Sequence, residues 1–216
     1  METIISTTED FVKQQLAGDS SGHDWWHIHR VRNLALSIAK QENADLFIVE
    51  MAALLHDVGD PKMHGGDTTV APRLIGNLLS TINLTKQQKE HIMHIIAHMS
   101  FGKHLKGEEV QKSIEFQIVQ DADRLDAMGA VGIARTFAFG GSKGRLMYHP
   151  DIKPNKNLTS EAYHKAEDPT INHFYEKLLK LKDLMNTETA KEIAQDRHEY
   201  MEQFLEHFYA EWDGHK

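Results

Sequence analysis

The 216-residue sequence contains no cysteine and no long hydrophobic run. The absence of cysteine excludes disulfides, thiolate nucleophiles and cysteine-based zinc sites, and it fits the reducing cytoplasm in which we expect the protein. The amino-terminal residues show no basic region that leads into an apolar segment, so we expect no signal peptide. The longest apolar run is shorter than the ~20 residues that a membrane-spanning helix requires, so we expect no association with a membrane.

Charge and histidine content narrow the class of protein further. The net charge is −8 at pH 7, which argues against sequence-independent binding of nucleic acid, because such binding requires a basic surface. Fifteen histidines are an unusual number and favour a metal or phosphate site. The length and the hydrophobic content of 40% indicate a soluble protein of one domain, residues 1–216.

Hydrophobic periodicity predicts an all-α fold, a single helical bundle. Nearly every segment repeats its apolar residues at helical spacing, and no stretch shows sustained alternation. A capping pattern at Ser6 predicts the start of the first helix, and an aspartate and a proline at 168–169 predict the start of another. Further expected helices lie at about 85–99, 108–128, 129–139 and 189–212.

The most informative stretch is the apolar run 46–55, in which Glu50 is the sole polar residue. Asp45 can cap its start, and a helix that is apolar on all sides is a buried one. Its last turn brings His56 and Asp57 out of the protein interior. A carboxylate in such a place needs a cation or several hydrogen-bond donors, because burying it alone is costly.

The candidate metal ligands are His27, His56, Asp57 and Asp123. Two imidazoles and two carboxylates suit one divalent cation of intermediate hardness, with Mn(II) preferred over Co(II), Ni(II) and Fe(II), and could also accept Mg(II) or Zn(II). Four protein ligands leave open positions for water and a phosphate oxygen. A histidine–aspartate pair alone is more often a satisfied polar pair at a helix end, so the hypothesis depends on all four residues together.

Three segments carry a family resemblance: residues 23–31, 54–59 and 120–130. In order and wording they resemble the HD-domain metal-dependent phosphohydrolases, and more narrowly the small bacterial members of the YpgQ and YedJ type. The resemblance covers about residues 20–150, and the helices at about 168–212 are expected to pack on this core. It implies a helical bundle around one metal ion and hydrolysis of phosphate esters or anhydrides, usually of nucleotides. For the YpgQ type it implies nucleoside triphosphate pyrophosphohydrolysis.

Three aspartates compete for the last ligand position. The family pattern aligns best on Asp123, which precedes Arg124, Leu125 and Asp126. Asp121 lies two residues earlier, about 200° around a helix, so both cannot easily bind one ion. Asp126 lies on the same face as Asp123 and is a candidate to support a ligand or contact the substrate.

Further candidates surround the predicted centre. Asp60 follows Asp57 by three residues and could act as general acid or base, although a turn aspartate before a proline is equally supported. The resemblance places His98 where it could contact a phosphate or a bridging solvent molecule, and gives His94 a weaker case. His23 could support a ligand or cap a helix.

A polyphosphate substrate also requires cationic side chains. Each candidate could instead be an ordinary surface charge, and the glycine-rich segment 140–145 is interpreted as a mobile flap because it lacks the strand and the ending of a P-loop. The substrate-binding candidates are Arg30, Lys62, Lys103, Arg124 and Arg145.

Several functions stay open on the sequence alone. Within catalysis, the alternative to a pyrophosphohydrolase is a 5′-nucleotidase that acts on (deoxy)nucleoside monophosphates; a cyclic dinucleotide phosphodiesterase is less favoured, because no Gly-Tyr-Pro follows. From another class, a non-catalytic nucleotide sensor would use the ion only to hold its ligand. The expected partner is a small nucleotide or phosphate ester, and a homodimer stays open.

Overall fold

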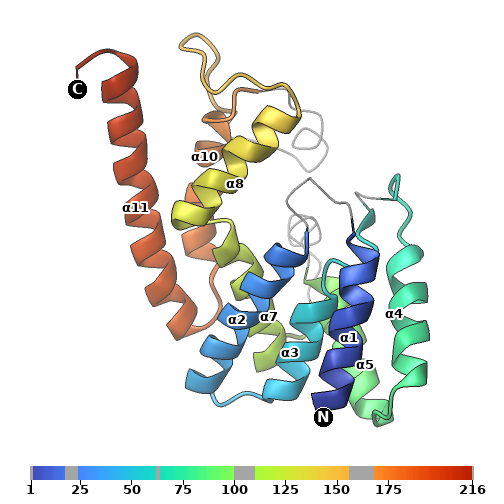
Figure 1. Ribbon diagram of the computed structural model, residues 1–216. Coiled ribbons are helices and arrows are strands. Elements are labelled where there is room, and N and C mark those ends of the chain that lie inside the picture. Colours follow the sequence, from blue (N-terminus) through green and yellow to red (C-terminus); the bar gives the residue numbers. More distant parts are fainter. Residues whose placement is uncertain (1, 18–23, 62–63, 100–109, 156–167, 216) are drawn as a thin grey trace. The chain divides into compact units, whose positions relative to one another are not determined.

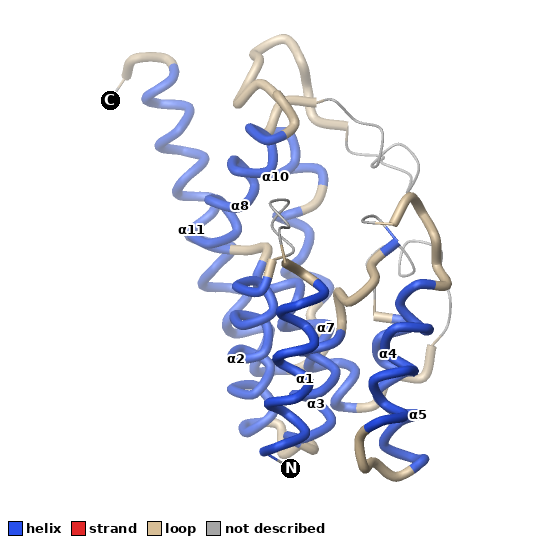
Figure 2. The backbone as a smooth tube through the Cα atoms, turned by 45° about the vertical axis from the view of Figure 1, so that its right-hand side comes forward, coloured by secondary structure: helices blue, strands red, loops and turns tan. Residues whose placement is uncertain are grey.

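The computed structural model describes residues 2–17, 24–61, 64–99, 110–155 and 168–215. Their contacts divide the chain into two compact units, Met1–Ala122 and Asp123–Lys216. Every regular element among these residues is a helix, which confirms the predicted all-α fold (Figures 1 and 2). None of the described helices is long and apolar enough to cross a membrane. The expected single domain stays a prediction.

The first unit contains five complete helices and most of a sixth among its described residues. They are α1 (Glu2–Gln15), α2 (Trp25–Gln41), α3 (Leu46–Leu55), α4 (Val70–Thr81), α5 (Lys86–His98) and α7 (Ile114–Asp126). The second unit contains the end of α7 and four further described elements. They are α8 (Gly129–Ser142), α10 (Asn172–Glu176), the 3₁₀ helix η2 (Leu178–Leu184) and α11 (Glu188–Trp212).

The expected helix starts at Ser6 and near residue 108 are wrong. α1 begins at Glu2, and the hydroxyl groups of Thr7 and Thr8 each donate a hydrogen bond to a carbonyl one turn back, so these residues lie inside the helix. In α7 the backbone amide of Phe116 donates to the Ser113 hydroxyl, 3.1 Å away. Ser113 therefore caps α7, and the described residues before it are not helical.

The helix expected from residue 168 is also different. The backbone amides of Thr170 and Ile171 donate to the carbonyls of Leu146 and Met147 at 2.8 and 2.9 Å. These donors are engaged by a neighbouring segment, and helical structure begins only at Asn172. It then continues as two short pieces, α10 and η2, instead of one helix.

The core of the first unit is built around α3, which packs against α1, α2 and α5. Seven of its ten residues are buried, from Ile48 to Leu55 with the exception of Glu50. Asp45 caps its start as predicted, because its carboxylate accepts hydrogen bonds from the backbone amides of Phe47 and Ile48. Side-chain burial on all sides of α3 fixes where the chain emerges at its end.

An ion-pair network explains the one polar residue of α3. Arg32 of α2 donates from Nε to Glu50 at 2.8 Å, and its two terminal nitrogens contact Glu50 and Glu9 of α1. Desolvation opposes the ionisation of Glu9, but Arg32 and Lys13 outweigh it and lower the pKa of Glu9 below 4.5. The network therefore joins α1, α2 and α3 through the two ion pairs of Arg32.

We expect Arg32→Met to lower the free energy of unfolding by ~1–3 kcal/mol, because two partly buried carboxylates lose their donor. Urea denaturation followed by circular dichroism measures the change. Lys86→Met is the matched control, since Lys86 pairs with Glu90 at 3.7 Å on an exposed surface, and it should leave stability unchanged. Equal effects of the two variants would contradict the assignment.

The second unit contains an aromatic cluster in which Phe174 is fully buried. The rings of Phe174 and Phe204 stack with centroids 5.7 Å apart, and Phe137 lies edge-on to Phe204 at 5.9 Å. Phe208 continues the cluster along α11. α11 also packs against α8 and η2, and Thr187 caps its start through the backbone amide of Ala190. The expected last helix is thus confirmed.

Candidate metal centre

Three helix ends lie at one end of the first unit. Short connections at 42–45 and 82–85 turn the chain at the opposite end, so α2 begins where α3 and α5 finish (Figure 1). His27 lies in the first turn of α2, which Asp24 caps by accepting a hydrogen bond from the His27 backbone amide at 2.9 Å. His56 and Asp57 directly follow the last residue of α3.

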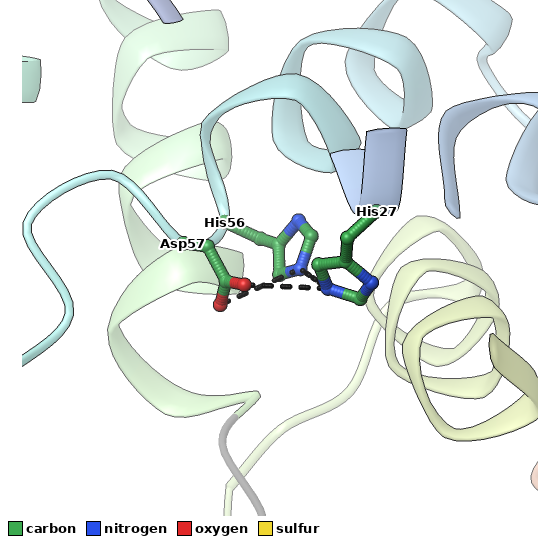
Figure 3. Close-up of side chains that lie close together, drawn as sticks. All are labelled: His27, His56 and Asp57. Atoms are coloured by element: carbon green, nitrogen blue, oxygen red, sulfur yellow. Dashed lines mark hydrogen bonds and ion pairs between the residues drawn. The ribbon is translucent and has the colours of Figure 1, made fainter. Parts of the chain in front are cut away.

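The side chains of His27, His56 and Asp57 converge (Figure 3). The Nε2 atoms of the two histidines are 3.2 Å apart. Asp57 places Oδ2 3.2 Å from Nε2 of His27 and Oδ1 3.5 Å from Nε2 of His56. His27 and Asp57 are buried, so these atoms meet away from bulk water.

The tautomer of His56 is set by the backbone. Its Nδ1 lies 2.8 Å from the carbonyl oxygen of Ala53. A carbonyl can only accept, so Nδ1 carries the proton and Nε2 of the neutral ring presents a lone pair toward His27 and Asp57. A hydrogen bond of this kind orients metal-binding histidines and fixes their tautomer.

The two Nε2 atoms and the two Asp57 carboxylate oxygens have spacings close to those of ligands to one ion. Ligand atoms about 2.1 Å from a divalent ion are about 3.0 Å apart at a right angle and about 3.4 Å apart at a tetrahedral angle. The observed separations of 3.2, 3.2 and 3.5 Å lie around this range. Two nitrogens and one carboxylate also form a donor set that suits first-row transition metals. The residues present therefore fit a divalent cation.

The turn after these residues depends on Gly59. Its φ is +72°, and a Cβ atom on it would lie 2.8 Å from the backbone N and Cα of Ala71. A side chain is therefore disfavoured both by the backbone conformation and by the close approach of the start of α4. The same turn holds Asp60, whose backbone amide donates to the Asp57 carbonyl at 3.2 Å.

The other predicted residues of the first unit have different positions. Arg30 is half-buried in α2, one turn after His27, and Asp60 is half-buried beyond α3. His98 is half-buried at the end of α5. Three predicted residues lie outside the described residues: His23, Lys62 and Lys103. All of these roles stay predictions.

α7 carries the three competing aspartates. Asp121 is fully buried, and Asp123 is half-buried. Asp126 is buried and forms an ion pair with Arg135 of α8, which also donates to the Asp126 backbone carbonyl at 3.3 Å. Arg124 is buried and donates to the Leu184 carbonyl. Asp123 as the fourth ligand, and the roles expected for Asp126 and Arg124, stay predictions.

The glycine-rich segment begins differently from what we expected. α8 continues through Ser142, so an irregular segment starting at Gly140 is wrong. A Cβ atom on Gly140 would lie 2.2 Å from the Thr170 hydroxyl oxygen, so the glycine permits close packing. Arg145 follows, and its guanidinium lies 5.6 Å from the Phe139 ring centroid. Its role in binding substrate stays a prediction.

The contacts that hold the end of α5 were not predicted from the sequence. Gln120, buried in α7, donates to the Met99 carbonyl at 2.9 Å and accepts from Lys112 at 3.1 Å. His94 contacts His98 directly, with ring centroids 4.7 Å apart. The spacing of four residues between these histidines was the available signal.

Comparison with known proteins agrees with this picture. Residues 25–128 match the HD domain family. YpgQ of Bacillus subtilis is 44% identical over 196 residues, which is 90% of this chain and 87% of that protein. A crystal structure of YpgQ in complex with ADP has a TM-score of 0.76 and 40% identity, and covers 97% of this chain and 98% of that one. An HD-superfamily hydrolase from Bacillus thuringiensis has a TM-score of 0.79 and 48% identity over 99% and 98% of the two chains.

Fold, site and relatives together define an all-helical, metal-dependent phosphohydrolase. The chain belongs to the HD domain family.

We expect Gly59→Ala to destabilise the protein by ~2 kcal/mol more than Gly65→Ala. Both glycines have positive φ, at +72° and +63°, but a Cβ on Gly65 meets no atom within 4 Å. Each variant costs ~1–2 kcal/mol for its backbone conformation, and Gly59→Ala alone adds the collision with Ala71. Urea denaturation compares them, and equal losses would show that the approach of α4 is unimportant.

We expect His173 to make stability depend on pH. Desolvation, followed by Lys177 and Arg145, lowers the pKa of His173 to about 3 from 6.5. Between pH 6.5 and 3, His173 is therefore protonated in the unfolded chain but not in the folded chain. The free energy of unfolding falls as pH falls through this range, by at most ~1.4 kcal/mol per pH unit. His173→Gln should flatten this slope in denaturation experiments between pH 5 and 7. A slope that the substitution leaves unchanged would contradict the prediction.

Proposed function

We propose that the protein hydrolyses nucleoside triphosphates to monophosphate and pyrophosphate. The convergence of His27, His56 and Asp57 is the observation that carries the proposal, because it offers one ion three ligands while open positions remain for solvent and phosphate oxygen. Asp123 is proposed as the fourth ligand on the family pattern. Mn(II) is the ion that we propose, because a mixture of nitrogen and carboxylate ligands can accept it.

A nucleotide substrate is supported by a relative. The YpgQ structure that resembles this chain contains ADP, a diphosphate of a nucleoside. Arg30 follows His27 by one turn of α2, a spacing that makes the two side chains neighbours on the helix surface. A guanidinium there is suited to bidentate contact with a phosphate. We propose Arg30 as the phosphate-binding arginine of the first unit.

The chain's own residues would orient the reactants and move protons. When bound, a divalent ion supplies Lewis acidity, which polarises a phosphoryl oxygen and acidifies water. Nε2 of His56 would hold the ion, because the Ala53 carbonyl keeps the proton of the neutral ring on Nδ1. Asp60 lies beyond the end of α3, and His98 lies in the last turn of α5. These two residues are the candidates to take a proton from water or deliver one to the leaving group.

The products separate this proposal from its alternatives. Attack at the α-phosphorus of a triphosphate releases pyrophosphate, whereas a 5′-nucleotidase releases orthophosphate and a nucleoside from a monophosphate. We expect a panel of nucleotides incubated with Mn(II) to yield pyrophosphate, resolved by ion chromatography. Release of orthophosphate from monophosphates alone would favour the nucleotidase, and tight binding without turnover would favour the sensor.

Metal binding provides a test that does not depend on the substrate. We expect His56→Ala to weaken Mn(II) binding at least ~100-fold in calorimetry and to abolish turnover, because one of the converging ligands is lost. His29→Ala is the matched control, since His29 contacts Trp26 and Asn33 on the surface of the same α2 that carries His27. Undiminished Mn(II) affinity of His56→Ala would exclude the centre.

A further inference from the structure

The last turn of α5 fixes a histidine in one tautomer. Nδ1 of His98 lies 2.9 Å from the backbone carbonyl of His94. Because that oxygen can only accept, Nδ1 carries the proton, and neutral His98 has its lone pair on Nε2. The imidazole can therefore accept a hydrogen bond at Nε2 but cannot donate one there. This excludes neutral His98 as a donor to phosphate through Nε2.

His94 also restrains the His98 ring by contact. The two ring centroids are 4.7 Å apart with an angle of 36° between the planes. His94 is itself held on two sides: its Nε2 donates to the Gln111 carbonyl at 3.0 Å, and its ring lies 6.0 Å from the ring of Phe116. A ring fixed in this way limits the rotation of its neighbour, as a packed side chain does in a protein interior.

These contacts lie at the end of the first unit that also holds the three converging ligands. α3 and α5 pack together, and both end there (Figures 1 and 2). A base whose ring is oriented by a further residue is the arrangement that activates a nucleophile in many hydrolases. In this chain the orienting group is another histidine, one turn earlier on the same helix.

We propose that His94 is a positioning residue that holds His98 with Nε2 as a proton acceptor for the attacking water. This rests on the proposed phosphohydrolase function. As the water oxygen bonds to the α-phosphorus, one water proton moves to Nε2 of His98, and the bond from phosphorus to the bridging oxygen breaks. Pyrophosphate leaves with that electron pair. The resulting imidazolium keeps its Nδ1 proton on the His94 carbonyl, and Nε2 later returns its proton to solvent.

Two substitutions separate the ring contact of His94 from its hydrogen bond to Gln111. His94→Phe keeps an aromatic ring between His98 and Phe116 but removes the donor to Gln111. His94→Gln keeps an N–H donor but removes the ring. His91→Ala is the matched control, because His91 lies on the same helix and contacts the Ser113 hydroxyl at 2.8 Å. Circular dichroism and thermal unfolding establish that each variant is folded.

The first readout is the tautomer of His98, measured by nitrogen NMR on the full protein labelled in histidine, without nucleotide. We expect a proton on Nδ1 alone in the wild type and in His91→Ala, and a mixture of tautomers in His94→Gln. His94→Phe should stay closer to the wild type, because it retains the ring contact. A wild-type His98 with its proton on Nε2 would overturn the proposal.

The second readout is a double-mutant cycle in kcat with a nucleoside triphosphate. We expect His98→Ala to lower kcat by ~100-fold or more and His94→Gln by ~10-fold, each with little change in KM. The double variant should be no slower than His98→Ala, because His94 acts only through His98. Multiplied losses in the double variant would overturn the proposal.

The two readouts distinguish the inference from the function on which it rests. If the wild type turns over no nucleotide, the proposed function and the proton transfer to His98 both fail. The NMR result then still decides whether His94 orients the His98 ring. If turnover is normal and His94→Gln leaves the tautomer and kcat unchanged, the positioning role alone fails.

Discussion

The first unit depends on placing a buried carboxylate and two imidazoles where an apolar helix ends. Such groups are costly in the interior unless each polar atom has a partner. The structure meets this condition by bringing the start of α2 against the end of α3, so that His27 reaches both His56 and Asp57 within 3.5 Å. The burial of α3 is what makes this arrangement rigid, because a helix enclosed by α1, α2 and α5 can deliver its last residues to only one place.

Much of this could be predicted because the signals are local. The cap at Asp45 and the capping box of Thr85 and Gln88 each act within four residues, the apolar run of α3 is continuous in sequence, and all three are present. The helix start expected at Ser6 was wrong because the same capping pattern also fits a helix interior. There the hydroxyl groups of Thr7 and Thr8 donate to carbonyls one turn back. A sequence pattern cannot distinguish these cases unless it also indicates where the preceding residues go.

What could not be predicted is tertiary in origin. The segment at 168–185 has the periodicity of a helix, but the amides of Thr170 and Ile171 are taken by the carbonyls of another segment, and the helical structure starts later. The sequence does not explain Glu50, because its partner Arg32 lies on another helix and donates to it only in the folded protein. The ligand triad was predicted only as part of a set of four residues strengthened by family resemblance, since a histidine–aspartate pair alone carries little information about what lies next to it.

Backbone carbonyls control the chemistry of the histidines at this end of the unit. His56 and His98 both donate from Nδ1, to the carbonyls of Ala53 and His94, and so both present Nε2 as an acceptor. The acceptor residue lies three or four positions earlier in each case, which is the reach of an imidazole back along its own helix. A helix terminus therefore supplies the orientation that other hydrolases obtain from a separate carboxylate. Substitutions of Ala53 or His94 leave the accepting backbone carbonyl in place. The tautomers of His56 and His98 are therefore determined by the fold of α3 and α5 and by the rings packed around each histidine.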